Sequence, residues 1–191
     1  NDKFTISGTR LRTAEPFDFD ATPELTVYLE VTDRAKLTYS QAISITVKDA
    51  NDPPTGLTID NNTIAENQAK GTEVGILTAI DLDTGDTHTY SVVGGKDKKH
   101  FAINGDRLIT NGPLDYELKS EMDLIIRVTD SGKISKDVPL PISVTNVNDG
   151  PTDINLSNNT IAENEPANTV VGKFSLVDLD AKYATPLQTV D

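Results

Sequence analysis

Hydrophobic and polar residues alternate one by one along several segments of the chain. Residues 25, 27, 29 and 31 are Leu or Val, and residues 124, 126 and 128 are Leu, Ile and Val. Segments 43–47 and 140–144 also have an aliphatic residue at every second position. A period of two is that of a strand with one buried face, and clusters of Gly, Asn, Asp and Pro between such segments are typical of turns. No helical stripe of useful length occurs, so the sequence predicts an all-β protein.

The pattern recurs at an offset of 97 residues. Residues 54–83 match residues 151–180 at 15 of 30 positions, and residues 4–20 match residues 101–117 at 8 of 17. We therefore predict a complete repeat at 54–150, the C-terminal half of a repeat at 1–53, and the N-terminal half of a further repeat at 151–191. Short alternating strands at this spacing predict tandem Greek-key, seven-stranded β-sandwiches.

Composition excludes several classes of protein. The chain has 191 residues, of which 30 are acidic and 17 basic, and its formal net charge is −13. Such a charge repels phosphates and argues against a nucleic-acid partner. No run of about 18 apolar residues occurs, so we expect no direct membrane insertion. The absence of cysteine excludes a disulfide scaffold and thiolate metal sites, and no apolar signal-peptide core opens the chain, so we expect a mature segment or an excised fragment.

Half of the carboxylates occur in a few short motifs, which account for 15 of the 30 acidic residues. In the complete repeat the motifs are IAEN (Glu66), DLD (Asp81, Asp83), LDYE (Asp115, Glu117) and RVTD (Asp130), with copies at Asp18, Asp20, Asp33, Glu163, Asp178 and Asp180. The junctions between repeats read DANDP at 49–53 and NVNDG at 146–150. Alternation along a strand would place Asp81 and Asp83 on one face, and likewise Asp115 and Glu117 if that segment is extended.

Carboxylates gathered in this way repel one another by on the order of a few kcal/mol at an effective dielectric constant of about 20. A hard cation with several oxygen ligands turns this penalty into binding energy, and calcium fits better than magnesium, which demands stricter octahedral geometry. Asparagine amide oxygens and backbone carbonyls at the junctions would complete the coordination shell.

The order IAEN, DLD, LDYE, RVTD and DANDP, on a repeat of this length, resembles cadherin repeats over essentially the whole chain. The resemblance implies an extracellular, cell-surface module without catalysis, in which about three calcium ions at each junction stiffen neighbouring repeats for adhesion or as a spacer. The near-identical repeats, the absence of cysteine and the Asn/Thr/Asp-rich turns further suggest a large bacterial surface protein.

The resemblance also implies a ligand set for each junction. At the first junction these are Asp18, Asp20, Asp49, Asn51, Asp52, the carbonyls of Ala50 and Pro53, and Asp81, Asp83 and Asp130. At the second they are Glu66, Asp115, Glu117, Asn146, Asn148, Asp149, the carbonyls of Val147 and Gly150, and Asp178 and Asp180. Two positions depart from the family pattern: Asp20 replaces glutamate, and Asn146 replaces the first linker aspartate, which should weaken one ion.

The two terminal segments together make up nearly one repeat. We therefore predict head-to-tail self-association, in which residues 151–191 of one chain complete residues 1–53 of another. Glu163 would then join Asp18 and Asp20, and Asp33 would join Asp178 and Asp180. The alternative is two disordered or partly folded arms around one folded repeat.

Other chemistries are weaker candidates. A calcium-dependent carbohydrate-binding module would need exposed aromatic platforms, and the chain has five Tyr, five Phe and no Trp. His88 and His100 are far apart in sequence and have no cysteine beside them, so we predict no zinc site. An EF-hand beginning at Asp81 fails because its twelfth position is Val92, which cannot act as a ligand.

Overall fold

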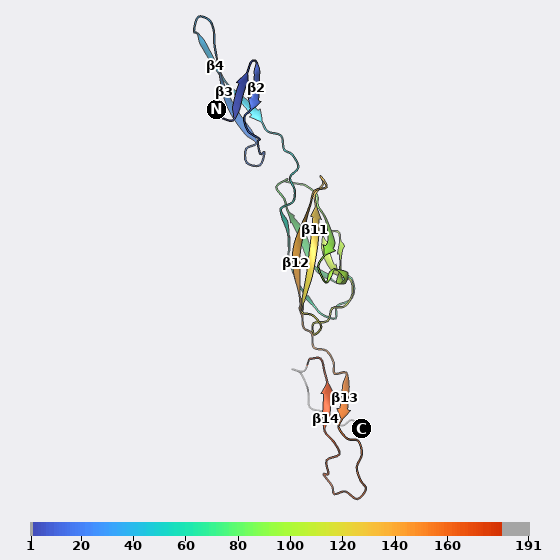
Figure 1. The fold of residues 1–191 in the computed structure, drawn as a ribbon. Coiled ribbons are helices and arrows are strands. Elements are labelled where there is room, and N and C mark those ends of the chain that lie inside the picture. The colour runs from blue at the N-terminus through green and yellow to red at the C-terminus, as the bar shows by residue number, and fades with distance from the viewer. Residues whose placement is uncertain (1, 181–191) are drawn as a thin grey trace. The chain divides into compact units, whose positions relative to one another are not determined.

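The computed structural model describes residues 2–180 (Figure 1). The chain divides into two compact units. One comprises the residues up to 56 together with 79–88 and 129–136, and the other comprises 57–78, 89–128 and the residues from 137 onward. Each acidic cluster described below lies within one of these units. The predicted division into parts at 1–53, 54–150 and 151–191 stays a prediction.

The central repeat is a β-sandwich of two four-stranded sheets. One sheet has the strand order β5-β7-β10-β9, and the other has the order β6-β12-β11-β8. The strands are β5 (Gly56–Ile59), β6 (Thr63–Ala65), β7 (Glu73–Ile80), β8 (Thr89–Gly94), β9 (Phe101–Asn104), β10 (Arg107–Thr110), β11 (Glu121–Thr129) and β12 (Ser135–Thr145), with a 3-10 helix at Lys98–His100 before β9.

The chain passes from one sheet to the other between β5 and β6. β5 lies beside β7, whereas β6 pairs in parallel with β12, with Ser143 opposite Thr63. Counting β5 and β6 as one divided strand gives seven, so the predicted all-β sandwich is confirmed. The core follows the predicted alternation: Leu108, Ile126, Val128 and Ile142 have no exposed surface.

Two-stranded sheets occupy the flanking parts of the chain. In the N-terminal part, β1 (Phe4–Ser7) pairs with β2 (Arg10–Thr13), and β3 (Glu24–Thr32) pairs with β4 (Thr38–Thr46) in an unbroken antiparallel register. In the C-terminal part, β13 (Asp153–Leu156) pairs with β14 (Phe174–Val177).

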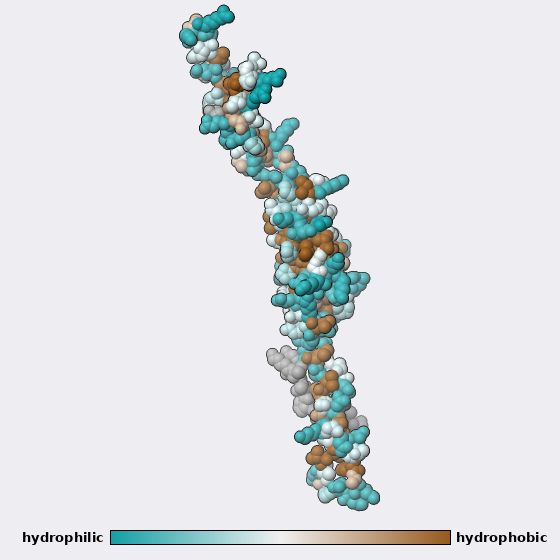
Figure 2. Space-filling model, in the orientation of Figure 1, coloured by the Kyte–Doolittle hydropathy of each residue, from teal (hydrophilic) through white to brown (hydrophobic). Residues whose placement is uncertain are grey.

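Hydrophobic side chains of the flanking parts lie at the surface, where the equivalent side chains of the central repeat are buried (Figure 2). Val31 is 64% exposed, whereas Val128, 97 positions later, is 0% exposed. Phe174 is 60% exposed, whereas Leu77, 97 positions earlier, is 2% exposed. The same sequence pattern therefore leaves an open apolar face wherever the second half of the sandwich is not paired with it.

Asp81 and Asp83 lie in a turn and not along a strand, so the alternation predicted for them is wrong. Asp115 and Glu117 also lie outside the strands, so the condition for their sharing one face of a strand is not met. β7 ends at Ile80, and the Asp83 N–H turns back to Asp81 Oδ1 at 3.2 Å. In LDYE the Leu118 N–H donates to Asp115 Oδ1 at 2.8 Å. The reason is the tendency of aspartate to accept a hydrogen bond from the backbone two or three residues onward, which favours a turn over an extended strand.

Candidate metal clusters

Glu66 is the most buried acidic residue of the cluster around the second junction. It lies directly after β6, and 1% of its surface is exposed. One carboxylate oxygen accepts the Tyr116 N–H at 2.7 Å, and the other accepts the Val147 N–H at 2.8 Å. Burying a charged carboxylate costs free energy unless hydrogen bonds compensate for the lost water. The two backbone N–H groups supply these bonds and fix the Glu66 carboxylate at the junction.

Other carboxylates converge on the same place. Ligand atoms of Glu66, Asp115 and Glu117 lie within 4.8 Å of one another. The Asn146 amide nitrogen donates to Glu117 Oε1 at 2.7 Å and to Asp180 Oδ1 at 2.8 Å, and the Asp149 N–H donates to Asp180 Oδ2. Asp180 is 5% exposed. IAEN, LDYE, the linker and the second DLD therefore form one cluster.

The carboxylates of this cluster repel one another, and no basic side chain among the described residues neutralises them. Burial raises the pKa of Glu117, and the neighbouring carboxylates Glu66, Asp180 and Asp149 raise it further. Hydrogen bonds from Asp149 N–H and Asn146 lower the pKa of Asp180. Among the described residues, no lysine or arginine forms an ion pair with any of these four carboxylates.

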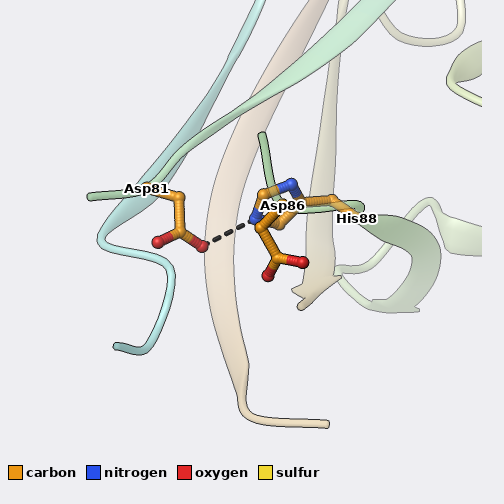
Figure 3. A group of neighbouring side chains, drawn as sticks. All are labelled: Asp81, Asp86 and His88. Atoms are coloured by element: carbon orange, nitrogen blue, oxygen red, sulfur yellow. Dashed lines mark hydrogen bonds and ion pairs between the residues drawn. The ribbon is translucent and has the colours of Figure 1, made fainter. Parts of the chain in front are cut away.

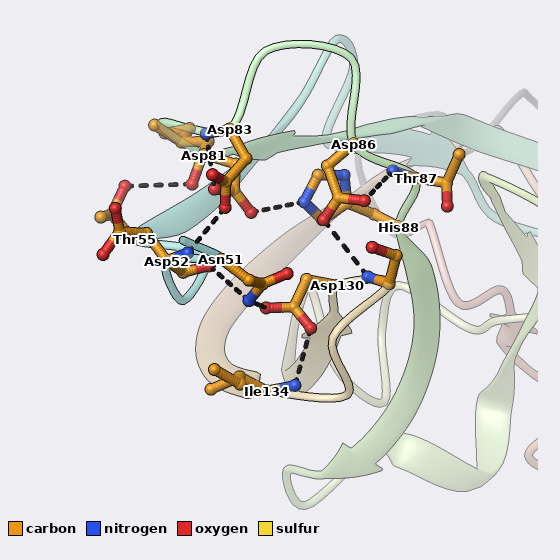
Figure 4. A network of polar contacts seen from close by, with 12 residues as sticks. Asn51, Asp52, Thr55, Asp81, Asp83, Asp86, Thr87, His88, Asp130 and Ile134 are labelled. Atoms are coloured by element: carbon orange, nitrogen blue, oxygen red, sulfur yellow. Dashed lines mark hydrogen bonds and ion pairs between the residues drawn. The ribbon is translucent and has the colours of Figure 1, made fainter. Parts of the chain in front are cut away.

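The residues of the first junction also form a cluster, which consists of the linker, the first DLD and RVTD (Figure 4). The Asp52 N–H donates to Asp83 Oδ2 at 2.7 Å, and the Asn51 amide nitrogen donates to Asp130 Oδ2 at 2.9 Å. Asp130 is 5% exposed, and its other oxygen accepts the Ile134 N–H at 2.7 Å. The linker is thus tied to both downstream motifs that the sequence assigns to it.

The upstream acids belong to the same neighbourhood. Burial raises the pKa of Asp20, and so do a side-chain hydrogen bond with Asp52 and the charges of Asp52, Asp49 and Asp18. Asp18 itself accepts the Ala21 N–H at 3.2 Å, which keeps it in a turn. The structure therefore gathers four carboxylates from residues 18–20 and 49–52.

Some predicted residues lie apart from the clusters, and others contact only the backbone of a cluster residue. Asp33 closes the β3–β4 turn, where its Oδ1 accepts the Leu37 N–H at 2.9 Å. Glu163 is exposed, whereas its equivalent Glu66 is buried. Asp178 accepts the Asp180 N–H at 2.9 Å, and the Asn148 amide donates to the Asp149 carbonyl at 3.0 Å. The carbonyls of Ala50, Pro53, Val147 and Gly150 stay predicted ligands.

Sequence reasoning missed Asp86 and His88. The turn at Gly85, whose φ is +87°, folds the chain back, so that both residues return to Asp81. His88 Nε2 lies 2.6 Å from Asp81 Oδ2 (Figure 3), and this contact is the first cause of the lowered pKa of Asp81. The only signal in the sequence was Gly85 followed by Asp86, between the DLD motif and a histidine.

The donor set of both clusters fits calcium. It consists of carboxylates, linker amide groups and backbone carbonyls, which are the hard oxygen ligands that calcium prefers. Glu66, Asp130 and Asp180 are nearly or fully buried. Among the described residues, none of the three forms an ion pair with a lysine or arginine. A divalent cation would remove the mutual repulsion that raises the pKa values of Asp20 and Glu117.

Comparison with known proteins finds a family match within the chain. Residues 60–145 match the model of the cadherin domain. Human protocadherin beta-1 is 30% identical over 181 residues, which cover 88% of this chain and 22% of that protein. The Caenorhabditis elegans protein cadherin EGF LAG seven-pass G-type receptor fmi-1 is 33% identical over 156 residues, which cover 75% of this chain and 6% of that protein. The chain thus spans less than a quarter of either relative.

Solved structures agree with the sequence matches. A structure of extracellular cadherin domains 1–4 of protocadherin gamma B7 superposes with a TM-score of 0.67 at 26% identity, covering 88% of this chain and 44% of that one. Among the described residues, no helix is long and apolar enough to cross a membrane. Cadherin domains bind calcium as a family property, and the family functions in adhesion. Together with the sandwich and the order of the acidic motifs, these matches show that the chain contains a cadherin-like domain.

Proposed function

We propose that the chain is a calcium-rigidified repeat module of an extracellular adhesion or spacer protein, without catalytic activity. The observation that supports it most is the cluster at the second junction, where Glu66 is buried and the pKa of Glu117 is raised by burial and by the charges of Glu66, Asp180 and Asp149. Within residues 2–180, no lysine or arginine forms an ion pair with these carboxylates. Each junction would hold about three calcium ions.

The mechanism follows from charge. Without calcium, the carboxylates of each cluster repel one another, and the linkers 49–53 and 146–150 are held by a few hydrogen bonds. With calcium, the linker, the preceding motifs and the following DLD share ligands, so that the segments move as one body. Extracellular calcium modules bind with dissociation constants of about 10⁻⁴–10⁻³ M, so rigidity would require the calcium concentration found outside cells.

Fluorescence energy transfer tests the rigidity directly. The chain has no cysteine, so Arg34→Cys and Glu121→Cys, both at exposed positions, give a uniquely labelled pair on two repeats. We expect a broad distance distribution in chelator and a narrow one in millimolar calcium. In a labelled chain that also carries Asp83→Asn, the distance distribution should narrow only at a higher calcium concentration than in the labelled chain without this substitution. An identical distribution with and without calcium would refute the proposal.

The open apolar faces support the finer proposal of self-association. Ile161 is 55% and Ile154 55% exposed, whereas the equivalent Ile64 and Leu57 are 6% and 8% exposed in the central repeat. A complementary half-repeat covers these positions in the central sandwich, and a second copy of the chain offers such a half. Light scattering of residues 1–191 in saturating calcium should show mass rising with concentration. A constant monomer mass up to high concentration would exclude the association.

The carbohydrate-binding alternative receives little support from the exposed tyrosines. Tyr28 is 77% and Tyr39 65% exposed. Tyr39 lies opposite Val31 in the β3–β4 register, and Tyr28 lies three residues before Val31. Because successive side chains point to opposite faces, the two rings lie on different faces of the hairpin and do not make one platform.

A further inference from the structure

We propose that Asp81, Asp86 and His88 form a site for a divalent transition-metal cation of the zinc type. One ligand atom from each residue lies within 4.8 Å of those of the other two. The site shares Asp81 with the proposed calcium cluster at the first junction, but it does not require that calcium binds there. It differs in chemistry, because an imidazole nitrogen is a ligand for zinc, copper and nickel but not for calcium.

The three side chains are held in place by the surrounding backbone. Asp86 Oδ1 accepts the Thr87 N–H at 2.6 Å, and its Oδ2 accepts the Ser131 N–H at 3.2 Å. Asp81 Oδ1 accepts the Asp83 N–H, which leaves Oδ2 directed at His88 (Figure 3). Such outer contacts orient ligands and add to metal affinity.

The His88–Asp81 pair is also well shielded from water. The His88 side chain is 11% exposed, and the Asp81 side chain is 5% exposed. A cation bound here would therefore interact with two carboxylates and one imidazole in a medium of lower dielectric constant than water. Two oxygens and one nitrogen from the protein leave a position for water, as in zinc sites with three protein ligands.

The histidines of the chain supply an internal control. His88 and His100 are the two histidines, and His100 lies in the 3-10 helix Lys98–His100, outside this group. Zinc titrated into the chelator-stripped chain should shift the imidazole resonances of His88 and leave those of His100 in place. Cobalt(II) should give visible absorption that depends on His88.

Matched variants decide the assignment. We expect His88→Gln and Asp86→Asn each to weaken zinc binding at least about tenfold, the loss typical of disturbing a metal site, and His100→Gln to leave it within about twofold. Asp86 is not a proposed calcium ligand, so Asp86→Asn carries the test if His88→Gln does not fold. Equal zinc affinity in wild type, His88→Gln and Asp86→Asn would overturn the proposal and leave the group as a hydrogen-bonded structural pair.

Calcium titration of the same samples separates this proposal from the proposed function. His88→Gln should retain calcium binding, because the imidazole is not a calcium ligand. Calcium binding without a zinc effect on His88 would overturn only the transition-metal site. Zinc binding at His88 without any calcium binding would support the site and overturn the calcium module.

Discussion

Glu66 Oε1 accepts the backbone N–H of Val147 at 2.8 Å, although 81 positions separate the two residues in the chain. This bond joins the IAEN motif at the start of the central repeat to the linker at its end. A motif at the start of the repeat is thus part of the cluster at its far junction.

Replacement of Glu66 by glutamine should reduce both stability and calcium binding. The amide can accept only one of the two backbone N–H bonds from Tyr116 and Val147, so the other donor is left unpaired at a cost of about 1–3 kcal/mol. Urea unfolding in chelator measures this loss. Glu163→Gln is the matched control, because Glu163 is the equivalent residue and is exposed. Equal losses for both variants would contradict the role of Glu66.

Asn146→Asp should have opposite effects with and without calcium. The Asn146 amide nitrogen donates to both Glu117 and Asp180, and aspartate cannot donate. We therefore expect lower thermal stability in chelator and about tenfold tighter calcium binding at the second junction, since the substitution adds a carboxylate. The first junction has Asp49 at the equivalent position, so its calcium affinity should not change. A variant that is equally stable in chelator would show that the two hydrogen bonds contribute nothing.

The ion pair between the buried Asp97 and the partly exposed Lys119 should contribute to stability at neutral pH and lose that contribution in acid. Burial alone would raise the pKa of Asp97, but the Lys119 ammonium at 2.6 Å and the Asp123 N–H at 2.7 Å lower it below the ordinary value of 3.8. Because the folded value is the lower one, the contribution is complete above 3.8 and is lost as pH falls through the folded pKa.

Asp97→Asn tests this pair. We expect a loss of about 1–3 kcal/mol in unfolding free energy near neutral pH, which shrinks over a series from about pH 6 to pH 3. Asp137→Asn is the control: Asp137 pairs with Arg127, the two side chains are 45% and 46% exposed, and the loss should be much smaller than for Asp97→Asn because solvent screens such a pair. A pH-independent loss for Asp97→Asn would contradict the assignment.

Gly95 should tolerate alanine much less well than Gly71. Both have positive φ, +92° and +90°, but a Cβ on Gly95 would lie 2.1 Å from the Asp123 carbonyl oxygen, whereas nothing lies within 4 Å of one on Gly71. We expect about 1–2 kcal/mol for Gly71→Ala from backbone strain alone, and a clearly larger loss for Gly95→Ala. Similar melting temperatures for the two variants would show that β11 can move away from Gly95.

The sequence was sufficient to predict the all-β sandwich. Alternation placed Ile126 and Val128 in the core correctly because one face of that strand is buried. It placed Asp81 and Asp83 wrongly, because the strand ends at Ile80 and local Asp–backbone bonding replaces the ladder.

Asp86 and His88 could not be assigned to the site from the sequence. Their approach to Asp81 depends on the turn at Gly85 and on the Ser131 N–H, which comes from a loop 45 positions later. Conversely, Glu163 has the same motif as Glu66 but lacks its burial. A motif fixes the type of ligand, whereas the packing around it determines whether the group is held for binding.

A calorimetric calcium titration of the chelator-stripped chain tests the central claim most directly. We expect binding of several ions per chain, about three at each junction, with dissociation constants of about 10⁻⁴–10⁻³ M or tighter. The Glu66→Gln chain should lose affinity only at one group of sites. The absence of binding heat up to several millimolar calcium, at two temperatures, would contradict the account and leave the acidic clusters as hydrogen-bonded turns.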